Sequence, residues 1–543
     1  MKNKLIESRT HPILCSVLII ICCVSPAFAV RPGWERKEVD WRGPAGLKVK
    51  AVRYPQDRPV PTEQGRAARQ PIVSESRGLT VKGDVSALEA IQGGTGILAY
   101  VIDSPPIDGF VPWIAVGITD ARSYDWMDTI AYNENAVTGN YLTASPQTDY
   151  ALGIFDTGAS AHTLNVFDAA LTGVLDEGLV TSVMVTLTGA TGDANAWVSQ
   201  PVGVFLDGLE AIDASSLEVN DVNMAGQSNM SIVVGDIDES PNMPTVVGCP
   251  LAIFFTTVIR NGQQITLNLG GEEIVGPEIS VYPQDDPRIP SYPNKINLEL
   301  RPTDGASVLY FPCIEIEEGD CPDGDGSPQM PTTVWGFLPT QSLFFTSRTD
   351  LTHGIRTSQQ KKFMFDTGAE VTVISEAQAA ELELNPQEPD FEVEIMGIAG
   401  DFIVVPGFYI DRLEISATPQ WLTYTNVPVI MVDIGSPEGG VMDGIVGMNL
   451  FMDMDFYIRG GGLAGQDQPY IKFQFLPPGL AGDIAPSAGN GKVDIFDLAT
   501  LANAWLATPL SPDWNSQADM FSDAIINFKD YAILAGNWLQ ESN

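Results

Sequence analysis

The stretch FMFDTGAEVTVIS, residues 363–375, places Asp366-Thr-Gly between two apolar runs. A second stretch, GIFDTGASAHTL at 153–164, begins in the same way around Asp156. The glycine permits a tight turn, and the threonine hydroxyl can hydrogen-bond to nearby backbone. One such turn would be unremarkable alone, but a carboxylate next to buried strands is costly to keep, so its repetition indicates a function. The residues expected to support the two aspartates are Thr157, Gly158, Thr367 and Gly368.

The regions around the two motifs repeat each other in order, which indicates a duplicated unit. The spacings between matching landmarks differ, but the order of four of them is kept. The pairs are IFDTGAS (154–160) with MFDTGAE (364–370), TGATGD (188–193) with MGIAGD (396–401), LDGLEAI (206–212) with IDRLEIS (410–416), and VVGCPLA (246–252) with IVGMNLF (445–451).

Two related units can bring Asp156 and Asp366 face to face. Two carboxylates at hydrogen-bond distance do not both ionise easily, so they share a proton and titrate as a pair. The ionised partner can take a proton from a water molecule, while the neutral partner hydrogen-bonds a scissile carbonyl oxygen. This chemistry requires no metal and no histidine, and the chain has only three histidines.

Length and composition favour several β-rich domains. The chain has 543 residues, with 44% hydrophobic residues, 51 glycines and 39 prolines, so two to four domains with many turns are expected. Short alternating runs such as 180–187, 264–269 and 469–476 predict strands between residues 83 and 480. Pro283–Pro331 is proline-rich and acidic and predicts a long excursion.

The first 29 residues have the pattern of a secretory signal. Three basic residues precede the apolar run Ile13–Val24, and AFA at 27–29 offers a cleavage site. We therefore expect a secreted, cell-surface or periplasmic protein, cleaved after Ala29 and without a membrane span thereafter. In an oxidising compartment Cys313 and Cys321 could form a disulfide, which would leave Cys249 as a buried, inert thiol.

Charge is distributed unevenly along the chain. Residues 30–82 hold 12 basic and 6 acidic residues, whereas residues 83–543 hold 14 basic and 62 acidic residues. So acidic a body is expected to repel nucleic acid. The basic segment 30–82 is either a linker or a prosegment that lies over an acidic cleft, and the sequence leaves both possibilities open.

The DTG motifs resemble those of the aspartic peptidases, and DTGAEVTVI (366–374) is particularly similar to the retropepsin version. The resemblance implies an all-β, two-lobed acid-protease-like fold, with lobes at 83–270 and 271–480, catalytic residues Asp156 and Asp366, and a protein or peptide substrate. Apolar-apolar-glycine elements at 246–248 and 445–447 would pack beneath the catalytic loops. The flaps that close over substrate in that family would carry Gly189, Gly192, Gly397 and Gly400.

The tail, residues 481–543, contains a second repeat. GNGKVDIFDLATLANAWL (489–506) aligns with SDAIINFKDYAILAGNWL (522–539) at a constant offset of 33. Each unit predicts a polar loop followed by a short amphipathic helix. The tail resembles a dockerin module, which implies a small all-α domain with structural Ca²⁺ and a cohesin-type partner. The implied ligands are Asp483, Asn490, Asp494 and Asp497 in the first loop, and Asp519, Asp523, Ile525, Asn527 and Asp530 in the second.

These features predict a secreted, bacterial aspartic endopeptidase that carries a calcium-dependent tether. The alternative is a non-catalytic peptide-binding or surface-assembly protein on the same fold. The separation of the Asp156 and Asp366 carboxyl groups is the structural observation that bears most directly on this choice.

Overall fold

The computed structural model describes most of the chain between residues 99 and 476 and parts of both ends. The described residues are 34–38, 48–55, 72–74, 80–82, 99–120, 130–132, 141–189, 192–221, 224–236, 240, 243–269, 272–301, 309–312, 333–336, 338, 343–396, 402–435, 441–462, 467–476, 492–508, 518, 525–536 and 538–539.

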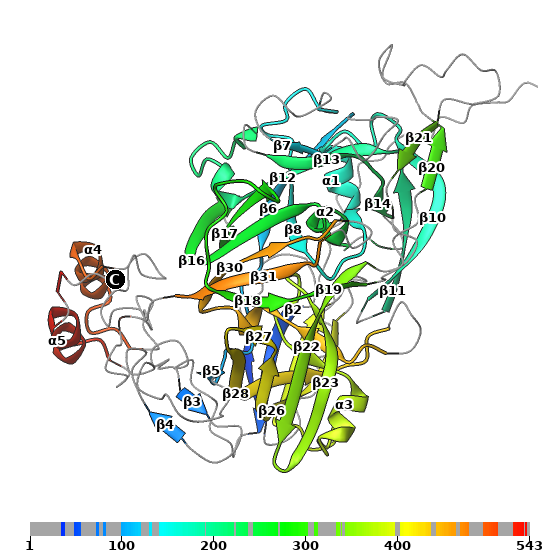
Figure 1. The fold of residues 1–543 in the computed structure, drawn as a ribbon. Coiled ribbons are helices and arrows are strands. Elements are labelled where there is room, and N and C mark those ends of the chain that lie inside the picture. The colour runs from blue at the N-terminus through cyan, green and yellow to red at the C-terminus, as the bar shows by residue number, and fades with distance from the viewer. Residues whose placement is uncertain are drawn as a thin grey trace, which may run out of the picture.

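Three large sheets form the body, and each DTG motif belongs to a different one of the two largest (Figure 1). The ten-stranded sheet carries Asp156. Its strands are β6 (Trp113–Thr119), β7 (Ile130–Tyr132), β8 (Ala151–Asp156), β9 (His162–Leu164), β10 (Val180–Gly189), β11 (Gly192–Ser199), β12 (Val202–Gly208), β13 (Ala225–Met230), β14 (Ile232–Gly235) and β15 (Val246–Gly248).

The eleven-stranded sheet contains the strand that leads into Asp366. Its strands are β1 (Trp34–Glu38), β2 (Lys48–Pro55), β5 (Ala99–Asp103), β19 (Glu299–Arg301), β22 (Phe344–His353), β23 (Arg356–Phe365), β24 (Val373–Ile374), β25 (Phe391–Met396), β26 (Phe402–Ile415), β28 (Trp421–Met431) and β29 (Gly444–Val446).

A six-stranded antiparallel sheet lies between the other two (Figure 1). In this sheet β16, which follows the first unit, pairs with β30, which follows the second. The strands are β16 (Phe255–Leu269), β17 (Glu272–Pro283), β18 (Asn294–Asn297), β27 (Ala417–Thr418), β30 (Met454–Arg459) and β31 (Tyr470–Phe475). The lobe boundary expected at 270/271 thus falls within the β16–β17 hairpin, inside this shared sheet.

Smaller elements complete the fold. Two short hairpins are formed by β3 (Ile72–Ser74) with β4 (Thr80–Lys82) and by β20 (Leu309–Pro312) with β21 (Thr333–Gly336). The helices are α1 (Val166–Leu171), α2 (Cys249–Ala252), α3 (Glu376–Glu381), α4 (Ile495–Asn503) and α5 (Phe528–Gly536), with 3₁₀ turns η4 (Leu209–Ala211) and η6 (Met448–Leu450). Within the described residues, no helix combines the length and apolar character needed to span a membrane.

The predicted strands are confirmed: residues 180–187, 264–269 and 469–476 correspond to β10, the end of β16, and β31. One large apolar core runs through the three main sheets and includes Phe155, Phe255, Phe365 and Phe456, all at most 1% exposed. Because Phe155 and Phe365 immediately precede the two aspartates, burial of these rings fixes where both DTG turns leave their strands.

Part of the basic segment 30–82 is an integral strand. Residues 48–55 form β2, which pairs antiparallel with β25. Val52 and Tyr54 are buried, and Arg53, only 6% exposed, lies 3.8 Å from the Glu392 carboxylate. These contacts give residues 48–55 a structural place in the second unit.

Candidate active site

The two units build their DTG turns from matching elements. In the first half-site, defined as the Asp156–Gly158 turn with its supporting strands, β15 pairs in parallel with β8 and antiparallel with β9. In the second half-site, the Asp366–Gly368 turn with its supporting strands, β29 pairs in the same way with β23 and β24. Each turn is therefore held at the end of a central strand that is buried next to the turn, in agreement with the apolar run that precedes each DTG motif.

The structure brings the two predicted catalytic aspartates together. The Asp156 and Asp366 carboxyl groups are hydrogen-bonded to each other, and each side chain is 8% exposed. Each carboxylate also lies against the glycine of the opposite turn: a Cβ added to Gly158 would collide with Asp366, and one added to Gly368 would collide with Asp156. Glycine is required at both positions because the opposing turns approach so closely.

Backbone groups orient each carboxylate from its own turn. The Gly158 and Ala159 N–H groups donate to Asp156 Oδ1 at 2.8 and 3.0 Å. The Gly368 N–H donates to Asp366 Oδ1 at 2.8 Å. One oxygen of each carboxylate is thereby fixed.

The two threonines cross-link the turns. Thr157 Oγ1 donates to the Phe365 carbonyl at 2.8 Å and accepts from the Thr367 N–H at 3.1 Å. Thr367 Oγ1 donates to the Phe155 carbonyl at 2.7 Å and accepts from the Thr157 N–H at 3.0 Å. Each hydroxyl therefore donates one hydrogen bond and accepts another inside the core, and each turn is positioned directly by the other.

Burial raises the pKa values of both aspartates. Burial raises the pKa of Asp366 well above its usual value, and the negative charge of Asp156 raises it further. Burial also raises the pKa of Asp156, although the hydrogen bonds from Asp366, Gly158 and Ala159 oppose that rise. The pair is therefore built to keep one proton at a pH where two separate carboxylates would have lost both.

Beneath each turn, a glycine allows backbone to pass close to backbone. A Cβ on Gly248 would meet the Ala159 carbonyl, and one on Gly447 would meet the Val371 carbonyl. The next residues donate N–H groups back to the turns: Cys249 to the Ala159 carbonyl and Met448 to the Ala369 carbonyl, both at 2.8 Å. The apolar-apolar-glycine elements at 246–248 and 445–447 therefore lie where the sequence led us to expect them.

The sequence interpretation missed three buried polar residues beneath these turns, His162, Thr372 and Asn449. His162 Nδ1 accepts from the Gly248 N–H at 3.0 Å. Thr372 Oγ1 accepts from the Gly447 N–H at 3.3 Å and donates to Asn449 Oδ1 at 2.7 Å. A signal was present, because His162 and Thr372 both stand six residues after their DTG aspartate.

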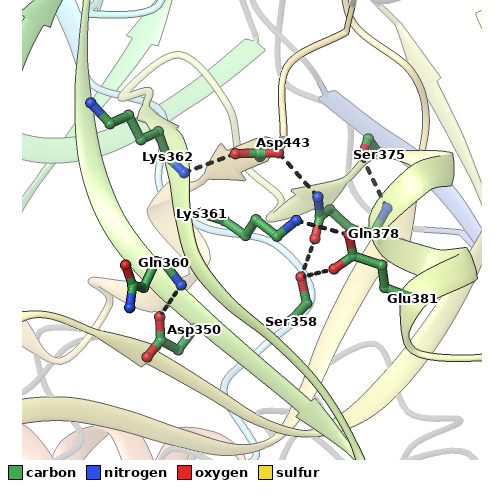
Figure 2. A network of polar contacts seen from close by, with 9 residues as sticks. All are labelled: Asp350, Ser358, Gln360, Lys361, Lys362, Ser375, Gln378, Glu381 and Asp443. Carbon is green, nitrogen blue, oxygen red and sulfur yellow. Dashed lines mark hydrogen bonds and ion pairs between the residues drawn. The ribbon is translucent and has the colours of Figure 1, made fainter.

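A polar network ties the helix of the second half-site to its strand (Figure 2). The Ser358 hydroxyl on β23 lies within hydrogen-bond distance of Gln378 and of Glu381, both on α3, the latter at 2.6 Å. Lys361 Nζ reaches Glu381 Oε1 at 2.9 Å, and Gln378 Nε2 reaches Asp443 Oδ1 at 3.0 Å. The helix that follows the second DTG turn is thus anchored to β23, the strand that leads into that turn.

The glycines expected in flaps belong to two pairs of antiparallel strands, β10–β11 and β25–β26. Gly189 and Gly192 face each other at the end of the β10–β11 hairpin; Gly397 and Gly400 lie outside the described residues, between β25 and β26. Side chains of β10 share an apolar cluster with Ala161, and side chains of β25 and β26 share one with Val371. Ala161 and Val371 each follow their aspartate by five residues, so each hairpin packs on its own half-site.

Only some of the cysteines and of the predicted tail ligands lie within the described parts of the chain. Cys249 is buried and free, and burial and the charge of Asp156 raise its thiol pKa, which makes it unreactive. Cys313 and Cys321 lie outside the described residues, as do Asp483, Asn490, Asp519 and Asp523.

In the tail, the repeat forms two helices that begin in the same way. Asp494 caps α4 and its N–H donates to Asp497 Oδ2 at 2.6 Å; in the second unit the Asn527 N–H donates to Asp530 Oδ2 at 2.8 Å. Asp497 and Asp530 are fully buried. Ile525 offers its carbonyl to Asn527 Nδ2 at 2.9 Å.

Within the described residues, no group of three or more His, Cys, Asp or Glu side chains could hold a metal ion. The described tail ligands carry oxygen donors, the type of ligand that a hard cation takes, and the other implied side-chain ligands lie outside those residues. Asp497 and Asp530 are oxygen donors at matching positions of the repeat, and both are removed from water, where a neighbouring positive charge would stabilise them.

Residues 354–450 match a family model described as Aspartyl protease. The chain contains an aspartyl protease-like domain. The matched region includes Asp366, Thr372 and Asn449 and the strands β23, β24 and β29 that support them. Aspartyl proteases, as their name states, act on protein substrates.

Two further comparisons add little. No curated protein sequence matches the chain. A solved structure titled "Crystal structure of Basic 7S globulin from soybean" is similar at 8% identity with a TM-score of 0.26, over 68% of this chain and 95% of that one. A similarity so distant has no bearing on the function of this chain.

Proposed function

We propose that this protein is an endopeptidase in which Asp156 and Asp366 act as one catalytic pair. The observation that carries the proposal is the hydrogen bond between their carboxyl groups, made between two turns with matching geometry. Raised pKa values at both residues, caused first by burial, favour a state with one shared proton.

In that state the pair can perform both halves of peptide hydrolysis. The ionised carboxylate takes a proton from a water molecule held between the two groups, and the water oxygen attacks the scissile carbonyl carbon. The neutral carboxyl group donates its proton to the carbonyl oxygen, so no full oxyanion forms. The C–N bond then breaks as the leaving nitrogen takes a proton from the pair, while a hydroxyl of the tetrahedral diol gives a proton back to it. The products are an amine and a carboxylic acid, and the pair again holds one shared proton.

The test is cleavage of a mixed peptide library by the purified protein across acidic to neutral pH, followed by mass spectrometry. We expect Asp156→Asn, Asp366→Asn and the double variant to be about equally inactive, each down by about 10³-fold or more, because residues acting as a unit do not contribute additively. Asp213→Asn is the matched control, since Asp213 lies in an exposed turn and caps only Ser215 and Ser216.

Two outcomes would oppose the proposal. Full activity in either single variant would exclude the pair. Peptide binding without cleavage at any pH would favour the alternative, a peptide-binding or surface-assembly protein. Chelators should leave peptide hydrolysis unchanged, since the proposed mechanism uses carboxyl groups and water alone.

We further propose that the protein is exported by its first 29 residues and is tethered by a calcium-binding tail. The buried carboxylates of Asp497 and Asp530, repeated at matching helix starts, support this part. A cohesin-type protein is the proposed partner. Circular dichroism of the whole protein should show helix gained with Ca²⁺ and lost with chelator, and Asp497→Asn with Asp530→Asn should abolish that change; an unchanged wild-type spectrum would oppose it.

A further inference from the structure

In both half-sites the same backbone N–H donates to a side chain, but the type of accepting side chain differs. The N–H of the glycine beneath each turn needs an acceptor, because it is buried. In the second half-site the acceptor is the Thr372 hydroxyl, which itself donates a hydrogen bond to Asn449 Oδ1. Thr372 and Asn449 are both at most 1% exposed, and neither side chain titrates in the physiological range.

In the first half-site an imidazole takes the place of that hydroxyl. His162 Nδ1 accepts from the Gly248 N–H at 3.0 Å, and the residue is 2% exposed. The residue that corresponds to Asn449 is Pro250, which has no side-chain acceptor to offer. His162 Nε2 is buried and has no hydrogen-bond partner in the part of the chain that the structure describes.

This geometry selects one form of the ring. An Nδ1 that accepts a hydrogen bond carries no proton, so the neutral ring carries its proton on Nε2. Protonation of Nδ1 would remove the acceptor and turn an N–H toward the Gly248 N–H. It would also place a cation in the core, where Nε2 already lacks an acceptor.

We propose, on the basis of the function proposed above, that His162 is a positioning residue for Asp156 and works only as a neutral imidazole, so that its protonation sets the acid limit of the first half-site. Gly248 is the link between the two residues, since it pairs with Asp156 in the parallel β8–β15 ladder. When the Gly248 N–H loses its acceptor, the strand that holds the Asp156 turn loses its register.

The surroundings of the ring offer little to stabilise a charge. The strands that pair with β9, namely β14 and β15, carry no titratable side chain. Three titratable groups stand on other nearby elements: Asp156 at the end of β8, which pairs with β15, Asp168 on α1, which contacts β9, and Cys249 at the start of α2. Burial raises the pKa of each of these three groups, which reduces their negative charge in acid.

The sign of the pH effect follows from the same burial. Burial lowers the pKa of His162 to about 3, whereas the pKa of an exposed histidine is about 6.5. Between these values the unfolded chain binds a proton at this position and the folded chain does not. Stability is therefore fully present above the unfolded pKa and is lost as pH falls toward the folded one.

Histidine NMR tests the ring directly and does not depend on peptide cleavage. The chain has three histidines, so the wild-type protein can be labelled with nitrogen-15 at histidine alone and assigned with His162→Asn. We expect the His162 ring to keep the neutral form with the proton on Nε2 from neutral pH down to the onset of acid unfolding. A ring that titrates near the value of an exposed histidine, or that carries its proton on Nδ1, would overturn the proposal.

Acid unfolding supplies the second readout. In His162→Asn the amide oxygen can accept from the Gly248 N–H but cannot become charged, so the midpoint of acid unfolding should move down by about half a pH unit or more. His353→Asn is the matched control, because the His353 side chain is 37% exposed beside Asp411, and its midpoint should stay at the wild-type value. A wild-type midpoint in His162→Asn would contradict the proposal.

Where peptide cleavage is measurable, the ratio of kcat/KM at about pH 2.5, below the pKa of His162, to that at about pH 6 should rise by about threefold or more in His162→Asn. His162→Ala, which offers no acceptor, should lower kcat at every pH. Equal pH profiles for the wild type and His162→Asn would overturn the role of His162. Absence of cleavage in the wild type would instead refute the proposed function, while the NMR and unfolding measurements would still decide the form of the ring.

Discussion

The first and second half-sites are alike where they would meet substrate and differ one layer below. Both place an aspartate on a turn oriented by its own backbone N–H groups and cross-linked through a threonine. Below the turns, His162 stands where the other half has Thr372 with Asn449. The proposed reaction requires a fixed geometry at the aspartate pair. The residues beneath the turns need only supply a hydrogen-bond acceptor for one buried glycine N–H.

The helices that follow the two turns are anchored differently as well. In the second half-site α3 is held by the network of Ser358, Gln378 and Asp443 (Figure 2). In the first, α1 is held by Asp168, whose carboxylate accepts from the Thr245 hydroxyl. A duplicated unit can thus keep its backbone topology while each copy solves its polar contacts with different side chains.

The glycines that face the opposite carboxylate should give the largest effect. Gly158→Ala and Gly368→Ala each place a methyl group against the other aspartate, and displacement of a catalytic group by about 1 Å costs about 10²-fold in rate. Kinetics on the best library peptide should show about equal losses, at least of that size. Gly536→Ala is the control, since nothing lies within 4 Å of its added Cβ. A tolerated change on one side only would show that the two turns are not equivalent.

The threonine cross-link should give a smaller, matched loss of stability. Thr157→Val and Thr367→Val each leave a buried carbonyl and a buried N–H without a partner, at about 1–3 kcal/mol for each group. Denaturant unfolding should show similar losses for both variants and a non-additive double variant, because the two hydroxyls belong to one network. The corresponding serine variants should recover most of the loss. Markedly different losses of unfolding free energy for the two valine variants would show that the two cross-links are not equivalent.

The smallest effect is expected where the two half-sites differ, in the side chains that anchor α3. Ser358→Ala removes the hydroxyl that joins β23 to α3 and should lower the free energy of unfolding by about 1 kcal/mol. Denaturant unfolding measures this loss, and the nitrogen-15 signals of His162 should stay unchanged because the network belongs to the second half-site. A shift of those signals would show that the two anchoring layers are coupled.

Several features could be predicted from the sequence because they depend on residues close together in the chain. The DTG turns follow from glycine and threonine directly after apolar strands, and the strands β10 and β31 from alternation within a few residues. The two tail helices follow from a repeat with a constant offset, and they appear as α4 and α5. The match of residues 354–450 to the Aspartyl protease model agrees with the resemblance seen in the second motif.

Other features depend on partners far apart in the sequence. The hydroxyl of Thr372 meets Asn449, 77 residues away, and the Thr157 N–H meets the Thr367 hydroxyl, 210 residues away. Residues 48–55 became a strand because the edge of β25 was available to pair with them. Composition alone marks residues 30–82 as basic and proline-rich, and carries no information about which strand edge residues 48–55 will meet.

The sequence by itself determined that this protein has two aspartate turns in a duplicated, β-rich body, because turn chemistry and strand alternation are local properties. Only the tertiary structure decided that Asp156 and Asp366 share a hydrogen bond, and that His162 is a buried acceptor for the Gly248 N–H. Both arrangements arise because the sheets pack on one core. Packing sets the distances between groups that the chain keeps far apart, and burial sets their pKa values.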